Sequence, residues 1–250
     1  MTNRAVSLII PAYNEEKRIG PFLSSLASLI DLNPSILCEI IVVDDGSKDK
    51  TAQIAQAALM RLPILRVIKQ EKNQGKGAAV KTGVMSASGD IIMFMDADGA
   101  TDAAEIPRML QAFAEKNPDI VVGNRFLPGA KTDRHSLLRR FSGFTYRSYM
   151  RLFGLGQIDT MCGFKGYKKD VAHFLFSNLM EERWLFDTEI AYKAVKNNYH
   201  IINLPITWES KDGSKLPTNT LIKSAFQIWP LIRRLDKQAT LSTQPLATKD

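Results

Sequence analysis

Short apolar runs alternate with longer stretches of helical spacing in the first half of the chain. The apolar runs read SLII, EIIVV, ILRVI, DIIMFM and DIVVG. The intervening helices are expected over residues 15–29, 50–61, 76–87 and 103–115. Strands that alternate with helices in this way are typical of a doubly wound sheet, in which helices cover both faces of a mostly parallel sheet. The pattern therefore predicts an α/β fold with five strands in the first half.

The alternation fades after Arg125. Helices are predicted over residues 136–153, 187–196 and 220–235, with a turn over 154–156 and a strand at HIINLPITW. Pro230 should kink or split the last helix, because proline removes a backbone donor. Residues 236–250 are polar, and we expect them to be a disordered tail. The chain is thus interpreted as one domain over residues 1–235, with a helical elaboration in its second half.

Composition and charge narrow the class of protein. With 250 residues and 45% hydrophobic positions, the chain can build one sizeable core. The first residues lead straight into a strand and no uncharged apolar run is long enough to span a bilayer, so we expect a soluble or peripheral, cytosolic protein. Cys38, Cys162 and the histidines are scattered, which indicates neither a disulfide framework nor a zinc site. The net charge of +7 suits nucleic acid, an anionic membrane surface or phosphorylated substrates.

Two carboxylates one residue apart end the apolar run MFMDADGA. Asp96 and Asp98 would lie at the carboxyl end of a buried strand, where open α/β sheets bind ligands. Side chains two apart in an extended segment point to the same side, and Mg2+ or Mn2+ prefers oxygen ligands. The pair therefore indicates either a metal-diphosphate site or an acidic loop in which Asp98 or Asp102 caps the next helix.

Polar residues also follow the first two strands, in PAYNEE and VVDDGS. They should line the same sheet edge, where Tyr13 offers a ring for stacking and Asp44 or Asp45 can accept hydrogen bonds from a base. The alternative is that Asn14 caps a helix and DGS is an ordinary tight turn. NQGKGAAV, with Lys76, matches neither a P-loop nor the dinucleotide-binding glycine pattern; it fits either a helix start that faces an anion or a simple loop.

Basic and aromatic side chains interleave between Arg139 and Phe153. Such a pattern fits single-stranded nucleic acid, an amphipathic helix at a membrane interface, or a solvated basic face. The helix expected over residues 220–235 is a second candidate for membrane contact, with packing on the core as its alternative. An interfacial helix accounts for the pattern in a chain that is expected to lack a membrane span.

Taken together and in this order, IIPAYNEE, VVDDGS, NQGKGAAV, DADGA and GNRF resemble the family-2 glycosyltransferases of the GT-A fold. The downstream segments DTMCGFK, ERWLFDTE and WESKDGSKL are similar to those of the dolichyl-phosphate β-glucosyltransferases, relatives of the dolichyl-phosphate mannosyltransferases. The resemblance implies a Rossmann-like, mostly parallel sheet flanked by helices. It also implies a nucleotide-sugar-binding half over residues 1–125 and an acceptor and membrane-side half over 126–235.

The resemblance further implies roles for individual residues. The nucleotide-sugar ligands would be Pro11, Tyr13, Glu15, Asp44, Asp45, Lys76, Asp96, Ala97 and Asp98. Asp96 and Asp98 would hold the metal and count as catalytic together with the acidic pair Asp187 and Glu189. Arg125 and Arg139 would bind the acceptor phosphate. Ala100 stands where the mannosyl relatives carry a Gln ligand, so a third protein ligand for the metal is not indicated.

The implied activity is inverting transfer of glucose from UDP-glucose to a polyprenyl (dolichyl-type) phosphate. It would take place at the cytosolic face of a membrane, with Mg2+ or Mn2+ as cofactor and without nucleic acid. Such a phosphate is mostly a dianion at neutral pH, so no strong general base is needed. One alternative keeps the fold and changes the donor to GDP-mannose, or the acceptor to another glycan or lipid. The others are a nucleotidyltransferase, against which the acidic PAYNEE argues, and a non-catalytic nucleotide- or membrane-binding protein.

Overall fold

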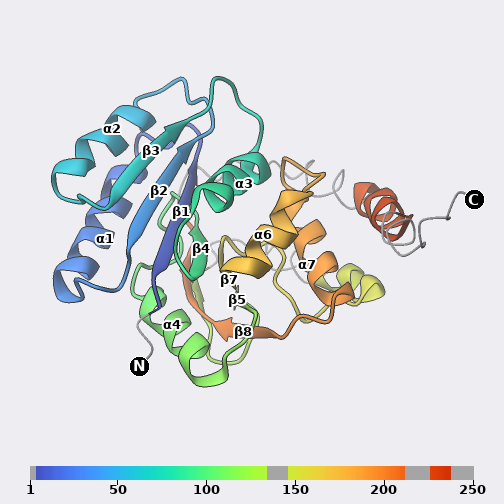
Figure 1. The fold of residues 1–250 in the computed structure, drawn as a ribbon. Helices are drawn as coiled ribbons and strands as arrows, with labels where there is room; N and C mark the ends of the chain where they lie inside the picture. The colour runs from blue at the N-terminus through green and yellow to red at the C-terminus, as the bar shows by residue number, and fades with distance from the viewer. Residues whose placement is uncertain (1–3, 134–145, 212–225, 238–250) are drawn as a thin grey trace, which may run out of the picture.

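The computed structural model describes residues 4–133, 146–211 and 226–237 (Figure 1). Seven strands form one sheet in the order β3-β2-β1-β4-β7-β5-β8. They are β1 (Val6–Ala12), β2 (Glu39–Asp44), β3 (Leu65–Lys69), β4 (Ile91–Met95), β5 (Ile120–Asn124), β7 (Phe164–Lys168) and β8 (Ile201–Pro205). All neighbours are parallel except that β7 runs antiparallel to β4 and β5. The sheet is therefore the mostly parallel one that the alternating pattern predicts.

Helices cover both faces of this sheet (Figure 1). One face carries α1 (Ile19–Leu32), α2 (Thr51–Ala57) with the 3-10 turn Ala58–Met60, and α4 (Glu105–Lys116). The other carries α3 (Lys76–Ser86), α6 (Lys169–Ser177), α7 (Phe186–Lys196) and the helical residues 226–237. Leu8 and Ile10 pack on the α1 side, whereas Ile9 packs on the α3 side. Successive residues of β1 thus serve opposite cores, as the two-residue period of a strand requires.

A second sheet of two parallel strands is formed by β6 (Lys131–Asp133) and β9 (Thr207–Glu209). Thr101, in the loop after β4, makes an isolated bridge to Trp208 of β9. The backbone N–H of Glu209 also donates to the carbonyl of Ala100 at 2.8 Å. These contacts hold the DADGA loop against the second half of the chain.

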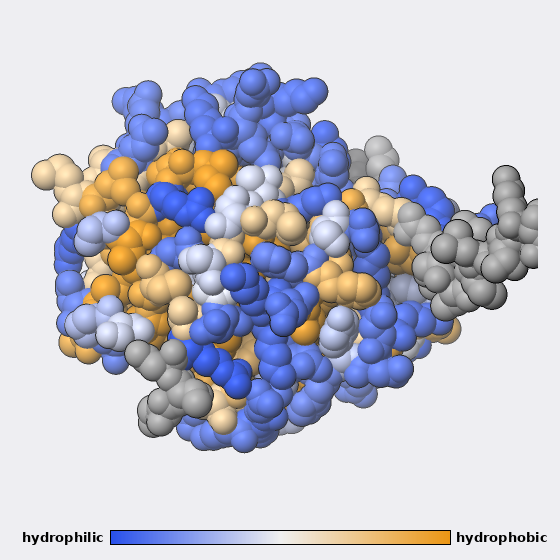
Figure 2. All heavy atoms as spheres, in the orientation of Figure 1, coloured by the Kyte–Doolittle hydropathy of each residue, from blue (hydrophilic) through white to orange (hydrophobic). Residues whose placement is uncertain are grey.

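Hydrophilic side chains prevail over much of the face seen in Figure 2, and hydrophobic ones gather on the side of α1 and α2. Leu32 at the end of α1 and Met60 after α2 are almost fully exposed. Single exposed apolar side chains such as these two are ordinary on a protein surface.

The five strands expected in the first half are confirmed, and so are the four helices between them. The first helix begins at Ile19, later than expected, because residues before it form a turn in which the Arg18 N–H donates to the Glu15 carbonyl. Strand β7 and helix α6 were missed. The single strand expected at HIINLPITW was wrong: β8 and β9 belong to different sheets and are separated at Ile206.

Two predicted helices in the second half fall partly outside the described residues, which exclude 136–145 and 220–225. Residues 146–150 are helical, and the 3-10 turn Arg151–Phe153 ends at Gly154, whose φ is 76°. The last helix runs unbroken through Pro230, so the predicted split was wrong, and Ile228 and Leu231 on either side of the proline are buried. The helix extends to residue 237, so residues 236 and 237 belong to it and not to the predicted tail. Residues 238–250 lie outside the described residues. Within the described ranges, no helix is long and apolar enough to cross a membrane.

Candidate active site

The carboxyl ends of β1, β2 and β4 are neighbours, because β1 lies between the other two strands. Ala12 is in register with Asp44, and Asp96 directly follows the last residue of β4. Lys76, the first residue of α3, joins this edge with its Nζ 2.5 Å from Asp96 Oδ1. The structure therefore brings the residues expected around a nucleotide diphosphate to one edge of the sheet.

Asp44 and Asp45, which the sequence left as alternatives, differ in their contacts. Asp44 Oδ1 accepts the N–H of Ser47 at 3.1 Å, while its buried Oδ2 has no hydrogen-bond partner in the described part of the chain. Asp45 accepts the N–H groups of Gln74 and Gly75 at 2.8 and 2.9 Å, and the Asn73 amide at 2.8 Å. Asp45 is thus occupied in holding the loop before α3. Asp44 retains a carboxylate oxygen that can accept a hydrogen bond from a base.

The remaining residues of the predicted nucleotide side contribute in different ways. Tyr13 is half-buried beside this edge, and Pro11 is buried within β1. The side chain of Ala97 is 3% exposed and packs in the core on the α1 side, so only its backbone is available to a ligand.

Asp96 lies directly against the backbone of Gly163, in the loop before β7. Its N–H donates to the Gly163 carbonyl at 3.0 Å, and a Cβ built on Gly163 would lie 2.0 Å from Asp96 Oδ2. Only glycine leaves room for the carboxylate in this position. Burial would lower the pKa of Lys76, but the charges of Asp96 and Asp187 outweigh it and raise that pKa. Lys76 therefore remains a cation beside Asp96.

Asp98 is held from two sides. Its Oδ1 accepts the N–H of Ala100 at 3.0 Å, and its Oδ2 lies 3.8 Å from Arg18 Nη1. Arg18 is mainly committed to Glu15, with Nε and Nη2 each 2.6 Å from a carboxylate oxygen. Burial raises the pKa of Asp98, and the neighbouring charge of Asp96 raises it further. Within the described part of the chain, the Asp98 carboxylate thus has no cation in hydrogen-bond contact.

Asp96 and Asp98 fit a divalent cation that takes its other ligands from outside the protein. Among the residues that the structure describes, no group of three or more His, Cys, Asp or Glu is placed to hold a metal. Ala100, in the position of the absent third ligand, is buried and offers no side-chain oxygen. Two carboxylates that repel each other nevertheless favour a cation between them, and oxygen ligands suit Mg2+ or Mn2+. Diphosphate oxygens and water would complete such a site.

Asp187, in the first turn of α7, is paired with a lysine that the sequence did not single out. Lys165 Nζ from β7 lies 3.0 Å from Asp187 Oδ1, and both side chains are almost fully buried. Lys165 also donates to the Cys162 carbonyl at 2.6 Å and lies over the Phe94 ring at 5.4 Å. Burial raises the pKa of Asp187, and the charges of Lys165 and Lys76 oppose that rise. A lysine inside the apolar stretch GFKGY was the only sequence signal of this pair.

Glu189 is fully buried, and its carboxylate is occupied by structural contacts. It accepts the N–H groups of Met180 and Glu181, at 3.0 and 2.8 Å, and forms an ion pair with Lys193 at 2.5 Å. These donors come from the segment before α7 and from α7 itself. In the structure, the carboxylate of Glu189, a predicted catalytic residue, therefore holds the loop that precedes α7.

Arg125 is already engaged by a carboxylate. Its Nε and Nη2 lie 2.8 and 2.9 Å from the two oxygens of Asp159, in a bidentate pair, and its guanidinium lies over Trp208 at 5.2 Å. Burial would lower the pKa of Arg125, but Asp159 raises it, so the charge is retained. A phosphate could bind only to those guanidinium N–H groups of Arg125 that do not donate to Asp159. Arg139, the other predicted phosphate ligand, lies outside the described residues.

Comparison with known sequences gives a consistent set of relatives. The family described as Glycosyl transferase family 2 matches residues 7–176. A dolichyl-phosphate beta-glucosyltransferase of Trichomonas vaginalis is 36% identical over 232 residues, covering 89% of this chain and 69% of the relative. The Dictyostelium discoideum protein of that name is 35% identical, covering 90% and 73%. The Homo sapiens protein is 32% identical, covering 85% and 70%.

Solved structures agree in fold at low sequence identity. Glucosyl-3-phosphoglycerate synthase from Mycobacterium tuberculosis, in complex with Mn2+, UDP and glucosyl-3-phosphoglycerate, superposes with a TM-score of 0.70 at 20% identity. The match covers 92% of this chain and 78% of that one. A complex of that synthase with Mg2+ and UDP gives a TM-score of 0.68 at 19% identity, with coverage of 92% and 78%. These neighbours share the sheet and its helices with this chain and hold a divalent metal and UDP.

Proposed function

The chain belongs to glycosyl transferase family 2, and from this premise we propose that it transfers glucose from UDP-glucose to a polyprenyl phosphate of the dolichyl type, with inversion. The observation that carries the proposal is the meeting of Asp44, Lys76 and the Asp96–Asp98 pair at one sheet edge, in a glycosyltransferase whose relatives are named for this activity. Mg2+ or Mn2+ is the proposed cofactor, since the two carboxylates suit a hard cation.

On the donor side, each of these residues is proposed to contact a different part of the nucleotide sugar. Asp44 accepts an N–H of the base with Oδ2, which has no hydrogen-bond partner among the described residues, and the half-buried Tyr13 ring flanks the base. Lys76 supplies a fixed positive charge for the diphosphate. Asp96 and Asp98 hold the metal, which when bound stabilises the negative charge of the departing diphosphate as a Lewis acid.

In the reaction, an acceptor phosphate oxygen attacks the anomeric carbon while the nucleoside diphosphate leaves. The acceptor is mostly a dianion at neutral pH, so its oxygen needs no proton removed by a strong base. Asp187 is buried and paired with Lys165, and it acts through charge by helping to keep Lys76 protonated. Arg125, and Arg139 outside the described residues, remain the proposed ligands of the acceptor phosphate because guanidinium groups bind phosphate and stay charged.

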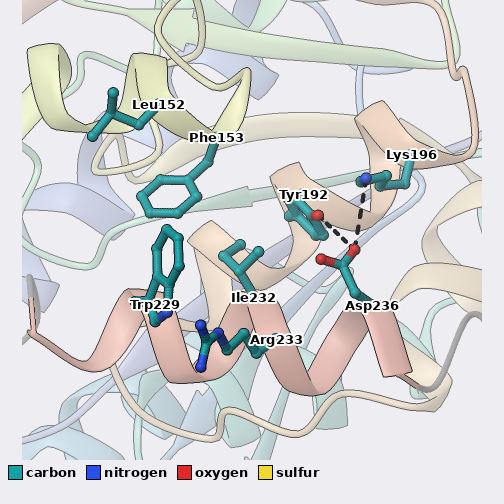
Figure 3. A pocket seen from close by; sticks show the side chains of 8 residues that line it. All are labelled: Leu152, Phe153, Tyr192, Lys196, Trp229, Ile232, Arg233 and Asp236. Atoms are coloured by element: carbon teal, nitrogen blue, oxygen red, sulfur yellow. Dashed lines mark hydrogen bonds and ion pairs between the residues drawn. The ribbon is translucent and has the colours of Figure 1, made fainter.

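Contact with the cytosolic face of a membrane is part of the proposal. The helix of residues 226–237 and the turn Arg151–Phe153 form a surface on which apolar rings and cations lie together (Figure 3). Phe226 is 79% exposed, Leu152 74% and Trp229 51%. Around a pocket of about 410 Å3, Trp229 faces the Phe153 ring and Arg233 lies over Trp229 at 5.1 Å. Apolar side chains flanked by cations suit an interface with anionic lipid.

The test is transfer of labelled sugar into a lipid extract, with a short polyprenyl phosphate as acceptor. UDP-glucose is compared with GDP-mannose, and Mn2+ with EDTA. Labelling from UDP-glucose only, dependent on metal, is expected; labelling from GDP-mannose would overturn the donor assignment. Asp98→Ala should abolish labelling, whereas Asp102→Ala, which removes an exposed carboxylate of the same loop, should retain it. Normal turnover of Asp98→Ala would contradict the metal assignment.

A further inference from the structure

The segment of residues 180–184, between α6 and α7, is fastened to the first turn of α3. The N–H of Gly77 donates to the Arg183 carbonyl at 3.3 Å, and that of Ala78 to the Glu182 carbonyl at 2.9 Å. A Cβ on Gly75 would lie 2.5 Å from the Glu182 carbonyl oxygen, so the approach requires glycine there. These N–H groups would otherwise be open at the helix start, where an anion binds. Here the segment occupies them, and Lys76 is left as the group that α3 offers to the donor.

Glu189 fastens the other side of the same segment. Both of its oxygens accept the N–H of Met180, at 3.0 and 3.1 Å, and one also accepts the N–H of Glu181. Lys193, one turn later in α7, neutralises the carboxylate. A charge buried to this extent is stabilised only by such a full set of donors. Glu189 therefore fixes the amino-terminal end of the segment, while the carbonyls of Glu182 and Arg183 fasten its other end to α3.

The segment ends beside the donor site. The Trp184 ring lies 5.8 Å from Lys76 Nζ, and that Nζ in turn contacts Asp96. Trp184 is 38% exposed, so part of its ring is open to a ligand. An aromatic face next to charged groups is a common wall of a small-molecule site, because it covers the apolar side of the ligand while polar groups fix its orientation.

We propose that Glu189 is a positioning residue, which holds the 180–184 segment so that Trp184 and Lys76 meet the sugar diphosphate of the donor. The inference rests on the proposed function for the identity of that donor. Trp184 is the ligand-contacting residue in this arrangement, and Glu189 acts through the segment. Glu189 is then excluded from proton transfer, because its oxygens are turned toward Met180, Glu181 and Lys193.

The test is the steady-state kinetics of Glu189→Gln. Glutamine has one acceptor oxygen, and its NH2 group, which can only donate, would face another donor, either a backbone N–H or the Lys193 ammonium. The 180–184 segment should therefore be held in place for a smaller fraction of the time. A tenfold fall in that fraction would raise the donor KM about tenfold, because apparent affinity falls with the competent population. The acceptor KM and the pH dependence of kcat should stay as in the wild type. Arg234→Gln is the matched control, since it removes only an exposed ion pair to the Glu181 side chain at 3.0 Å.

A double-mutant cycle separates positioning from general damage to the fold. Trp184→Ala should raise the donor KM by itself, and adding Glu189→Gln should raise it little further, because both changes remove the same contact. Loss of one limb of the pH profile in Glu189→Gln would make Glu189 a proton-transfer group and overturn the proposal. A lower Tm with an unchanged donor KM would also overturn it. The donor is whichever nucleotide sugar the wild type turns over, so failure with UDP-glucose is a separate outcome that concerns the proposed function alone.

Discussion

Substitution of Gly163 by alanine is expected to lower activity strongly while leaving the fold intact. The added Cβ would lie 2.0 Å from Oδ2, 2.2 Å from Cγ and 2.6 Å from Oδ1 of Asp96, and these are the three nearest atoms. Carbon and oxygen atoms in contact are about 3.5 Å apart, so the carboxylate must move by more than about 1 Å. The atoms that must move are the end of a side chain, which rotates at small cost. The strain therefore displaces the proposed metal ligand and spares the backbone.

The expected loss is about 100-fold in kcat/KM, the usual effect of a 1 Å misplacement in an active site. The assay is transfer of labelled glucose at several Mn2+ concentrations, together with thermal unfolding. The Tm should stay within about 3 °C of the wild type, and the Mn2+ concentration for half-maximal activity should rise. Gly20→Ala is the control, because its Cβ would lie 3.4 Å from Ile54, an ordinary contact. Wild-type turnover and Mn2+ dependence in Gly163→Ala would refute the placement of Asp96 as a metal ligand.

Three further predictions follow from other parts of the molecule. Asp44→Asn should weaken UDP binding about tenfold in calorimetry through loss of a charged acceptor, whereas Asp45→Asn should chiefly lower the Tm because it releases the loop before α3. Partial burial alone would raise the pKa of Glu39, but hydrogen bonds from serines and an arginine lower it from 4.5 to about 2. Because the folded protein favours the charged form, the wild type should lose stability as the pH falls from 4.5 toward 2. Between pH 7 and pH 3 the free energy of unfolding of the wild type should fall by about 1 to 2 kcal/mol from this group, after discounting for partial exposure. Urea unfolding at the two pH values should show that fall in the wild type and not in Glu39→Gln. Phe226→Ser with Trp229→Ser should reduce co-sedimentation with anionic vesicles but leave turnover of a soluble short-chain acceptor unchanged; equal co-sedimentation would contradict the membrane surface.

The first half of the fold was predictable because its information is local. Each buried parallel strand is an apolar run, and each is followed by the residues that a parallel sheet brings to one edge. Asp96 and Lys76, 20 residues apart, meet at 2.5 Å for that reason. The sequence shows the strands, and their common direction places the polar ends together.

The missed elements depend on contacts that no local pattern contains. Strand β7 is inserted between β4 and β5 although it comes after both, and it runs against them. Its Lys165 interrupts the apolar pattern, and the reason for a lysine there is Asp187, 22 residues later. Arg125 was expected to bind the acceptor phosphate, and the bidentate pair in which Asp159 holds it was not foreseen. In each case a charged residue is explained by a partner that only the tertiary structure supplies.

The balance of charge at the end of β4 explains why a lysine in this site is compatible with a metal. Lys76 compensates one of the two carboxylates, and Arg18 is committed to Glu15 at 2.6 Å and reaches Asp98 only at 3.8 Å. Among the described residues, no cation lies within hydrogen-bond distance of the Asp98 carboxylate, and burial, with the charge of Asp96 in addition, raises its pKa. A divalent cation held by Asp96 and Asp98 would offset their negative charge, and a bound diphosphate would give Lys76 a second anionic partner. If Asp96 and Asp98 hold the metal as proposed, the donor and the metal should bind cooperatively, each raising the affinity of the other by the same factor.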